Sequence, residues 1–158
     1  MRKWEKDNKG FSLVELIVVI LIMAIIAVAL APQVIKWVSN SRVATDLKTK
    51  NLVMEAMQMA VLTDEVVNEM ARDNGAKLVV DKDGMTLKRK ADGSGDDYAS
   101  SDALYQKFAE YAGISDFGKV KTKVSGSEIR IVVDEGAAII TAQYVDKDGH
   151  EVMDISDK

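Results

Sequence analysis

The chain of 158 residues contains no cysteine, a single proline (Pro32) and a single histidine (His150). Without cysteine there is no disulfide framework, no thiolate metal site and no cysteine nucleophile. His150 stands alone just after a turn signal, and no nucleophile and base can be placed around it in the way covalent catalysis requires. We therefore expect that this protein is not an enzyme.

Basic residues are scarce beyond the first ten positions. The whole chain carries 21 Lys and Arg against 25 Asp and Glu. Residues 1–10 hold four basic and two acidic groups, whereas residues 11–158 hold 17 basic and 23 acidic groups. An acidic body is a poor match for the nucleic-acid phosphate backbone, which requires clustered Lys and Arg. The basic N-terminus is therefore a local signal.

The main feature that is present is an uninterrupted apolar run, because every residue from Leu16 to Ala31 is apolar. Sixteen helical residues rise about 24 Å, and with its apolar flanks the segment spans roughly 40 Å. That is enough to cross a hydrocarbon core of about 30 Å. Lys36 and Trp37 follow, and both suit a membrane interface. The basic N-terminus predicts that the start of the chain stays in the cytoplasm.

A secretory signal peptide or a plain membrane anchor would be a simpler explanation of this run. A signal peptide should be cut after small residues, near Ala29 or Ala31, but the apolar character continues through "PQVIKWV". A plain anchor does not account for Glu15, because a carboxylate costs about 2.5–3.5 kcal/mol at the centre of a membrane helix and less near its end. Glu15 is therefore a candidate functional residue.

The stretch "KGFSLVELIVVILIMAIIAVALAP" resembles the class III signal of type IV pilins and pseudopilins. The resemblance covers residues 1 to about 45: a short basic leader, Gly10, Phe11, Glu15 and then the aliphatic run. It implies that a prepilin peptidase cuts between Gly10 and Phe11 and that the new Phe11 amine is N-methylated. It also implies that Glu15 and Pro32 serve assembly.

Cleavage at that junction leaves the apolar helix on the mature protein, first as a membrane anchor and later as the core of a polymer. The new amine at Phe11 is a cationic partner for Glu15. The two groups could pair within one helix, four residues apart, or between neighbouring subunits, as the resemblance implies. A desolvated pair is costly, but it fixes register because a misplaced subunit leaves a charge unpaired.

The chain departs from many members of the resembled group in two ways. Ala24 stands where many carry a helix-loosening glycine, and no cysteine closes a C-terminal loop. Pro32 still removes a backbone hydrogen bond and disfavours helix at Ala31.

Beyond Trp37 the apolar spacing predicts that the helix continues to the stop signal at Asn74. Its core face is expected to comprise Val43, Leu47, Met54, Met57 and Val61. The segment "SSDALYQKFAEYAG" predicts a short helix that Asp102 caps and Gly113 ends. One face of that helix should carry Leu104, Phe108 and Tyr111.

Turn signals and alternation predict the strands. "KLVVDKDGMTLKRK" reads as a hairpin. An antiparallel meander of three to four strands should follow, from "KVKTKVS", "SEIRIVV", "AAIITAQYV" and "HEVMDI".

We therefore expect an α+β, type IV pilin-like fold. The first half of a long N-terminal helix is transmembrane, and the second half packs on a 3–4-stranded antiparallel sheet. Residues 1–10 are the cleaved leader and residues 11–38 the transmembrane and polymerisation helix. Residues 39–158 are a soluble globular head, which includes the helix to about residue 74.

Two kinds of loop were weighed as metal sites. "DKDG", at residues 81–84 and 146–149, lacks the third ligand and the closing glutamate of an EF-hand and is best explained as a turn. "DGSGDD" is a more acidic loop, and some pseudopilins hold calcium in such loops. Asp92, Asp96 and Asp97 are therefore a candidate calcium site, with a plain surface loop as the alternative; no other metal or cofactor is expected.

Two basic clusters were weighed as DNA contacts. Lys119, Lys121 and Lys123 should alternate on one strand face, and Lys88-Arg89-Lys90 forms the second cluster. A solvated face that discourages edge pairing explains them better. The acidic net charge of residues 11–158 disfavours DNA as a partner.

These features favour a structural subunit of a type IV pilus or pilus-like filament, serving adhesion, motility, secretion or DNA uptake. Its expected partners are copies of itself, a prepilin peptidase, an inner-membrane assembly platform with its ATPase, and membrane lipid before assembly. We expect a single-pass membrane protein with a cytoplasmic leader and an extracytoplasmic head, and then a filament at the cell surface or in the periplasm or its equivalent. Major pilin, minor pilin and pseudopilin are not distinguished. The alternative is a single-pass membrane-anchored binding module that does not polymerise.

Overall fold

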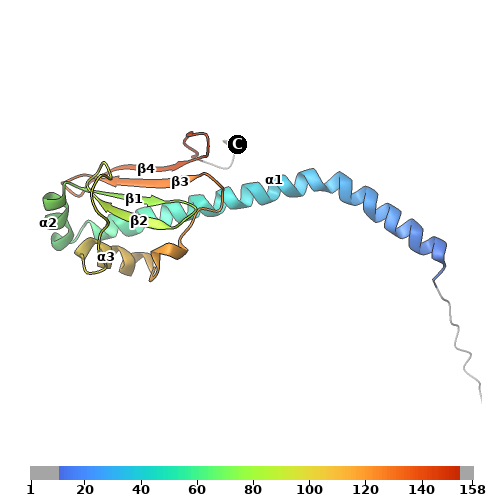
Figure 1. The fold of residues 1–158 in the computed structure, drawn as a ribbon, viewed down its shortest axis with the longest axis horizontal. Helices are drawn as coiled ribbons and strands as arrows, with labels where there is room; N and C mark the ends of the chain where they lie inside the picture. Colours follow the sequence, from blue (N-terminus) through green and yellow to red (C-terminus); the bar gives the residue numbers. More distant parts are fainter. Residues whose placement is uncertain (1–10, 154–158) are drawn as a thin grey trace, which may run out of the picture. The chain divides into compact units, whose positions relative to one another are not determined.

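The computed structural model describes residues 11–153, so the predicted cleavage residue Gly10 lies outside the described part. Its elements are shown in Figure 1. They are α1 (Leu13–Ala60), α2 (Asp64–Asp73), β1 (Ala76–Val80), β2 (Met85–Arg89), α3 (Ala103–Ala112), the 3-10 helix η1 (Phe117–Lys119), β3 (Glu128–Val133) and β4 (Ile139–Val145). Internal contacts divide the described residues into two units, one that ends at Val38 and one that begins at Ser39. The predicted α+β class, a long N-terminal helix and a four-stranded antiparallel sheet, is confirmed.

The described part of the first unit is a helix that packs against nothing. Every residue from Phe11 to Asn40 is exposed, and the helix is apolar all the way round. By length and composition α1 could cross a membrane. Pro32 lies inside α1, and Ala31 is helical despite the proline that follows it. A helix with no polar face needs lipid or protein around it, because water is a poor solvent for such a surface.

In the second unit, α1 supplies the floor of the hydrophobic core. Val43, Met57 and Val61 are buried, while Leu47 and Met54 are partly buried and pack against the core. The predicted core face of the helix is therefore confirmed.

The prediction of one unbroken helix to Asn74 is wrong. Helix α1 ends at Ala60 and α2 begins at Asp64. Thr63 adopts an extended conformation, with φ −87° and ψ 132°, and its hydroxyl donates to the Ala60 carbonyl at 2.5 Å. Asp64 and Glu65 then occupy the first turn of α2, where acidic side chains favour a helix start. The predicted stop at Asn74 is confirmed, because Asn74 is left-handed with φ 63°.

The sheet has the order β2-β1-β3-β4, and every neighbouring pair is antiparallel. Buried side chains alternate along β1 and β3 and join the core. The sheet lies over the second half of α1 (Figure 1). The buried side chains of the sheet include Leu78, Leu87, Ile129, Ile131 and Tyr144. The β1–β2 hairpin predicted at "DKDG" is confirmed, and it forms one half of the sheet.

Two of the four predicted C-terminal strands are absent from the described residues. "KVKTKVS" is a loop after η1, and "HEVMDI" contributes a single bridge between Glu151 and Val145. The loop is fixed by other partners instead. Thr122 N donates to the Asp81 carbonyl at 3.0 Å, and Lys123 N and Val124 N donate to a side chain of α1. Alternation alone predicted a strand where no neighbouring strand is available.

The side chain of α1 that accepts from Lys123 N and Val124 N belongs to Asp46, which is fully buried. Its carboxylate accepts from Lys123 N at 2.6 Å, Val124 N at 3.0 Å and the Tyr144 hydroxyl at 3.1 Å. Burial raises the pKa of Tyr144 to about 12, so its hydroxyl keeps the proton that it donates. One carboxylate on α1 therefore holds both the loop before β3 and the strand β4.

Helix α3 is confirmed with a different cap from the predicted one. Asp102 occupies the N-cap position, but its carboxylate accepts from Ala99 N and Arg89 Nη2, both at 2.6 Å, and makes no cap bond. Leu104 N donates instead to the buried Glu69 of α2, at 2.7 Å. Gly113 ends the helix as predicted.

The predicted face of α3 is only partly buried. Leu104 and Phe108 lie in the core, whereas Tyr111 is exposed.

We predict that Asp46→Ala destabilises the head strongly. The substitution leaves two backbone amides and a buried hydroxyl without their acceptor, and each unsatisfied group costs about 1–3 kcal/mol. In a fragment that begins at Ser39, the free energy of unfolding in urea should fall by about 3 kcal/mol or more. Glu55→Ala, an exposed acid on the same helix, is the control and should change it by less than about 0.5 kcal/mol. Equal effects of the two substitutions would contradict the role given to Asp46.

Candidate functional site

The start of α1 is organised by two side chains that cap it. Ser12 N donates to Glu15 Oε2 at 3.1 Å, and Val14 N donates to Ser12 Oγ at 3.3 Å. This is a capping box, in which a serine and a glutamate three residues later satisfy backbone donors of the first helical turn. The helix accordingly begins at Leu13.

The capping box has a sequence signal that the sequence analysis did not use. "SLVE" follows the S-x-x-E pattern and stands immediately before the apolar run. This pattern predicts a capping role for Glu15, beside the unusual charge that it places in a membrane segment. In the structure the carboxylate also has a local role, at the end of the helix where the macrodipole favours negative charge.

Phe11, where the mature chain is predicted to begin, is the most exposed of the large apolar side chains, at 87%. It precedes the helix and lies next to the Ser12–Glu15 pair. The structure therefore places the predicted modified residue and the predicted assembly carboxylate within one helical turn. Gly10, the other half of the predicted cleavage site, lies outside the described residues.

The remainder of the segment offers one kind of surface, made of aliphatic side chains. From Leu13 to Val38 the large apolar residues are between 44% and 77% exposed. Glu15 is the only acidic residue before Asp46 in this part of the chain, and Lys36 is the only basic one before Arg42. Chemically, the segment can insert into lipid or pack against other apolar helices, with one carboxylate near its start.

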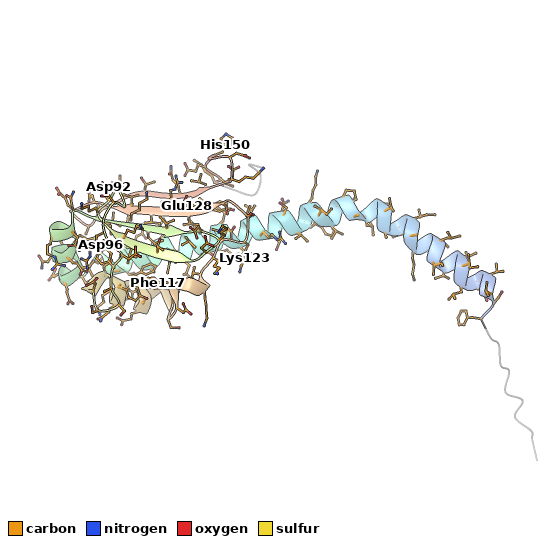
Figure 2. All side chains as sticks on the ribbon, viewed as in Figure 1. Asp92, Asp96, Phe117, Lys123, Glu128 and His150 are labelled. Atoms are coloured by element: carbon orange, nitrogen blue, oxygen red, sulfur yellow. The ribbon has the colours of Figure 1, made fainter. Side chains whose placement is uncertain are left out.

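The candidate calcium residues lie in the exposed loop between β2 and α3, and Figure 2 labels two of them, Asp92 and Asp96. Asp92 Oδ1 accepts from Ser94 N at 2.8 Å, and this bond lowers the pKa of Asp92. Asp97 forms a bridge with Lys88 of β2. Within residues 11–153, no three His, Cys, Asp or Glu side chains are grouped so as to hold a metal ion. The calcium site remains a prediction.

Both "DKDG" segments are turns built by their first aspartate. Asp81 Oδ1 accepts from Asp83 N and Gly84 N, and Asp146 Oδ1 accepts from Asp148 N and His150 N. His150 is exposed on the second turn (Figure 2), and its Nδ1 is 4.0 Å from Asp146.

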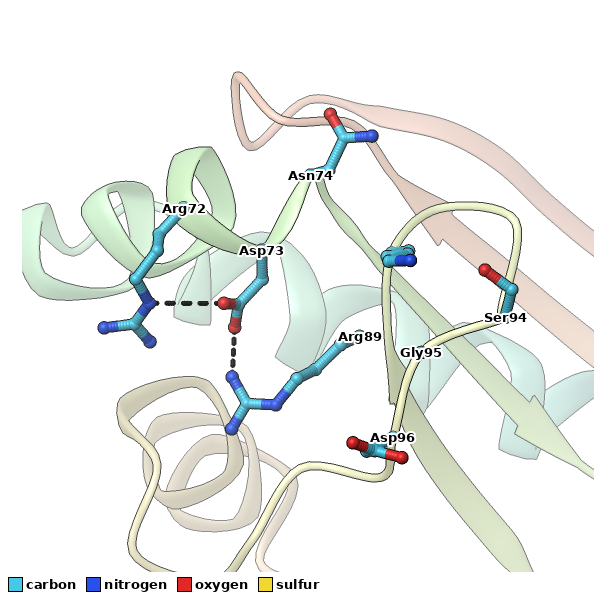
Figure 3. A pocket seen from close by; sticks show the side chains of 8 residues that line it. Arg72, Asp73, Asn74, Arg89, Ser94, Gly95 and Asp96 are labelled. Carbon is cyan, nitrogen blue, oxygen red and sulfur yellow. Dashed lines mark hydrogen bonds and ion pairs between the residues drawn. The ribbon is translucent and has the colours of Figure 1, made fainter.

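A surface pocket of about 380 Å³ lies between the end of α2 and the loop after β2. Figure 3 shows the Arg72 and Arg89 side chains directed at the Asp73 carboxylate. Arg72 Nε is 3.2 Å from Asp73, and Arg89 bonds both Asp73 and Asp102. The guanidinium of Arg89 also lies 4.5 Å from the centre of the Tyr98 ring. These charges already pair with one another, so the cluster ties α2, β2 and α3 together.

The two basic clusters do not form the predicted surfaces. Lys119, Lys121 and Lys123 are exposed and alternate with less exposed residues, but they lie on η1 and the loop after it and not on a strand. Arg89 is engaged by two carboxylates, which leaves Lys88 and Lys90 as the free members of the second cluster.

Comparison with known proteins identifies the N-terminal segment. A family model described as the prokaryotic N-terminal methylation motif matches residues 6–31. No curated protein and no solved structure matches the chain. The matched range contains the Gly10–Phe11 junction, the Ser12–Glu15 capping box and the whole apolar run from Leu16 to Ala31. Residues 6–31 of this chain are therefore a prepilin signal of the type IV pilin and pseudopilin type.

Proposed function

We propose that this protein is a structural subunit of a type IV pilus or pilus-like filament. A prepilin peptidase cleaves it after Gly10, Phe11 is N-methylated, and the mature chain polymerises through its N-terminal helix. The observation that carries the proposal is the coincidence of the methylation motif at residues 6–31 with a fully exposed apolar helix. The head supplies a second, independent support, since it has the α+β arrangement of a pilin.

The exposed helix explains why cleavage precedes the apolar run. A cut after the run would discard the only surface that can hold the chain in lipid. A cut before it leaves residues 11–38 on the mature protein, where lipid covers them first and neighbouring helices cover them later. With the basic leader in the cytoplasm, the head lies on the other side of the membrane. An assembly platform and its ATPase would then extract the subunit from lipid.

Glu15 has different partners before and after cleavage in this proposal. In the uncut chain the capping box occupies the carboxylate, and Ser12 N and Val14 N are satisfied locally. Cleavage creates a cation at Phe11, next to a helix N-terminus whose dipole disfavours positive charge. Glu15 of a neighbouring subunit can neutralise that cation in the apolar interior of a filament. Any other stagger leaves two charges buried without partners, so the pair selects the register.

The alternative is a membrane-anchored binding module that does not polymerise. In the described pocket between α2 and the β2 loop, Arg72, Asp73 and Arg89 already pair with one another, which weakens this alternative.

The N-terminus of the protein taken from membranes distinguishes the two proposals. We expect mass spectrometry to find a chain that begins with N-methylated Phe11, because the motif is read by a peptidase. Gly10→Leu is the control and should keep the leader, since a bulky residue obstructs the cut. An intact Met1 on the unsubstituted chain would support the binding module instead.

Glu15→Leu tests the assembly step. The substitution removes the cost of a carboxylate in lipid, so membrane insertion should be as good or better. Cleavage should persist, whereas the yield of sheared filaments should fall at least tenfold because nothing selects the stagger. Ser12→Ala is the matched control, since it weakens the same helix cap by about 1 kcal/mol and keeps the charge.

The control should assemble. Normal filaments from Glu15→Leu, with mature subunit still held in membranes, would refute intersubunit pairing.

A further inference from the structure

The loop after η1 carries a row of lysines that the proposed function does not use. Lys119, Lys121 and Lys123 are all exposed, and no acidic residue occurs between Phe117 and Ser127. Lys119 lies 3.4 Å from Asp116. Within residues 11–153, Lys121 and Lys123 form no ion pair within 4 Å. Two cations are therefore free on this loop.

The backbone of this loop is fixed to a known level of α1. Lys123 N and Val124 N donate to the buried Asp46, and Figure 2 shows Lys123 beside α1. Asp46 stands eight residues beyond Val38 in the sequence. Arg42, exposed on α1, stands four residues beyond Val38. We call Arg42, Lys121 and Lys123 the basal patch.

The acidic residues of the neighbouring β1–β2 turn do not pair with the basal patch. The β1–β2 turn adjoins the loop, because Thr122 N donates to the Asp81 carbonyl. Within that turn the Asp81 carboxylate holds two backbone amides, and Asp83 pairs with Lys82 at 2.6 Å. These acids are engaged by their own turn.

The patch is exceptional in a head that is otherwise acidic. Residues 39–158 carry 16 basic and 22 acidic groups. Without Arg42, Lys121 and Lys123, the head has 13 basic and 22 acidic groups. An anionic surface would repel most of the head and attract the basal patch.

We propose that the basal patch binds the phosphate groups of anionic lipids while the subunit is stored in the membrane. The inference rests on the membrane step of the proposed function. In the sequence Arg42 follows Val38, the end of the predicted membrane segment, by four residues, and basic side chains just beyond a membrane segment are attracted to anionic headgroups. Lysine side chains are long enough to reach a lipid phosphate while their backbone is fixed elsewhere. The contact holds the head close to the membrane and gives it one preferred face toward the lipid.

The test uses the full chain in vesicles, with lysine acetylation followed by mass spectrometry. On vesicles that contain phosphatidylglycerol, Lys121 and Lys123 should react about fivefold more slowly than on pure phosphatidylcholine, the factor that about 1 kcal/mol per lysine gives. High salt should remove the difference. Lys88 and Lys90 of the same molecule are the internal control and should react alike on both vesicles.

Because the chain has no cysteine, one introduced cysteine can carry a dye. This allows a second measurement with matched variants. Energy transfer from a dye on Ser125→Cys to a labelled lipid should be larger on the anionic vesicles. Lys121→Gln with Lys123→Gln should abolish that difference, whereas Lys88→Gln with Lys90→Gln, which removes the same charge elsewhere, should keep it.

Three results would overturn the inference. Equal reactivity of Lys121 and Lys123 on both kinds of vesicle means that the patch does not bind lipid phosphate. Protection that appears on neutral vesicles and grows with protein density means that a second copy covers the patch. A chain that does not float with neutral vesicles fails at the membrane step, which overturns the anchoring in the proposed function together with this inference.

Discussion

The structure depends on one constraint: residues 13–38 form a helix that has no polar face, and something apolar must always cover it. In the structure every residue from Phe11 to Asn40 is exposed. Lipid and other copies of the same helix are the two environments that meet the requirement. Glu15 is the single acidic residue of this helix before the head begins, so it is the group whose free energy changes most when lipid is exchanged for protein.

The head obeys a different constraint, which is to hold its sheet on the far end of the same helix. Asp46 meets it by fixing the loop before β3 and the hydroxyl of Tyr144 on β4 to α1. Glu69 does the same for α3, whose first free amide it accepts. Buried carboxylates on the helices therefore orient the outer elements, while apolar side chains fill the space between them.

The elements that local sequence determines were predictable. The apolar run, the β1–β2 turn and the helix stops at Asn74 and Gly113 each depend on residues a few positions apart. The break at Thr63 had a local signal as well, but the apolar spacing continues across it and favoured one long helix. The capping role of Glu15 was not predicted for a similar reason. Its charge in an apolar segment indicated an assembly role, whereas the S-x-x-E pattern indicates the cap.

The remaining features depend on contacts that no local pattern contains. Asp46 bonds residues 77, 78 and 98 positions away, and these bonds turn an alternating segment into a loop. Asp102 was expected to cap α3, yet Arg89 and Ala99 N take its carboxylate and Glu69, 35 residues from Leu104, supplies the cap. Spacing can identify a polar residue that needs a partner, but it does not identify the partner.

Glu15→Gln tests the central claim most directly, because it separates the two roles of this side chain. A glutamine can fill the capping-box position, so the start of α1 should be preserved. The negative charge is lost, so the Phe11 amine of a neighbouring subunit has no counter-ion. The account predicts a cleaved, membrane-held subunit that yields few or no filaments after shearing. Filaments from Glu15→Gln at the level of the unsubstituted protein would show that the cap alone explains the glutamate, and would contradict the account.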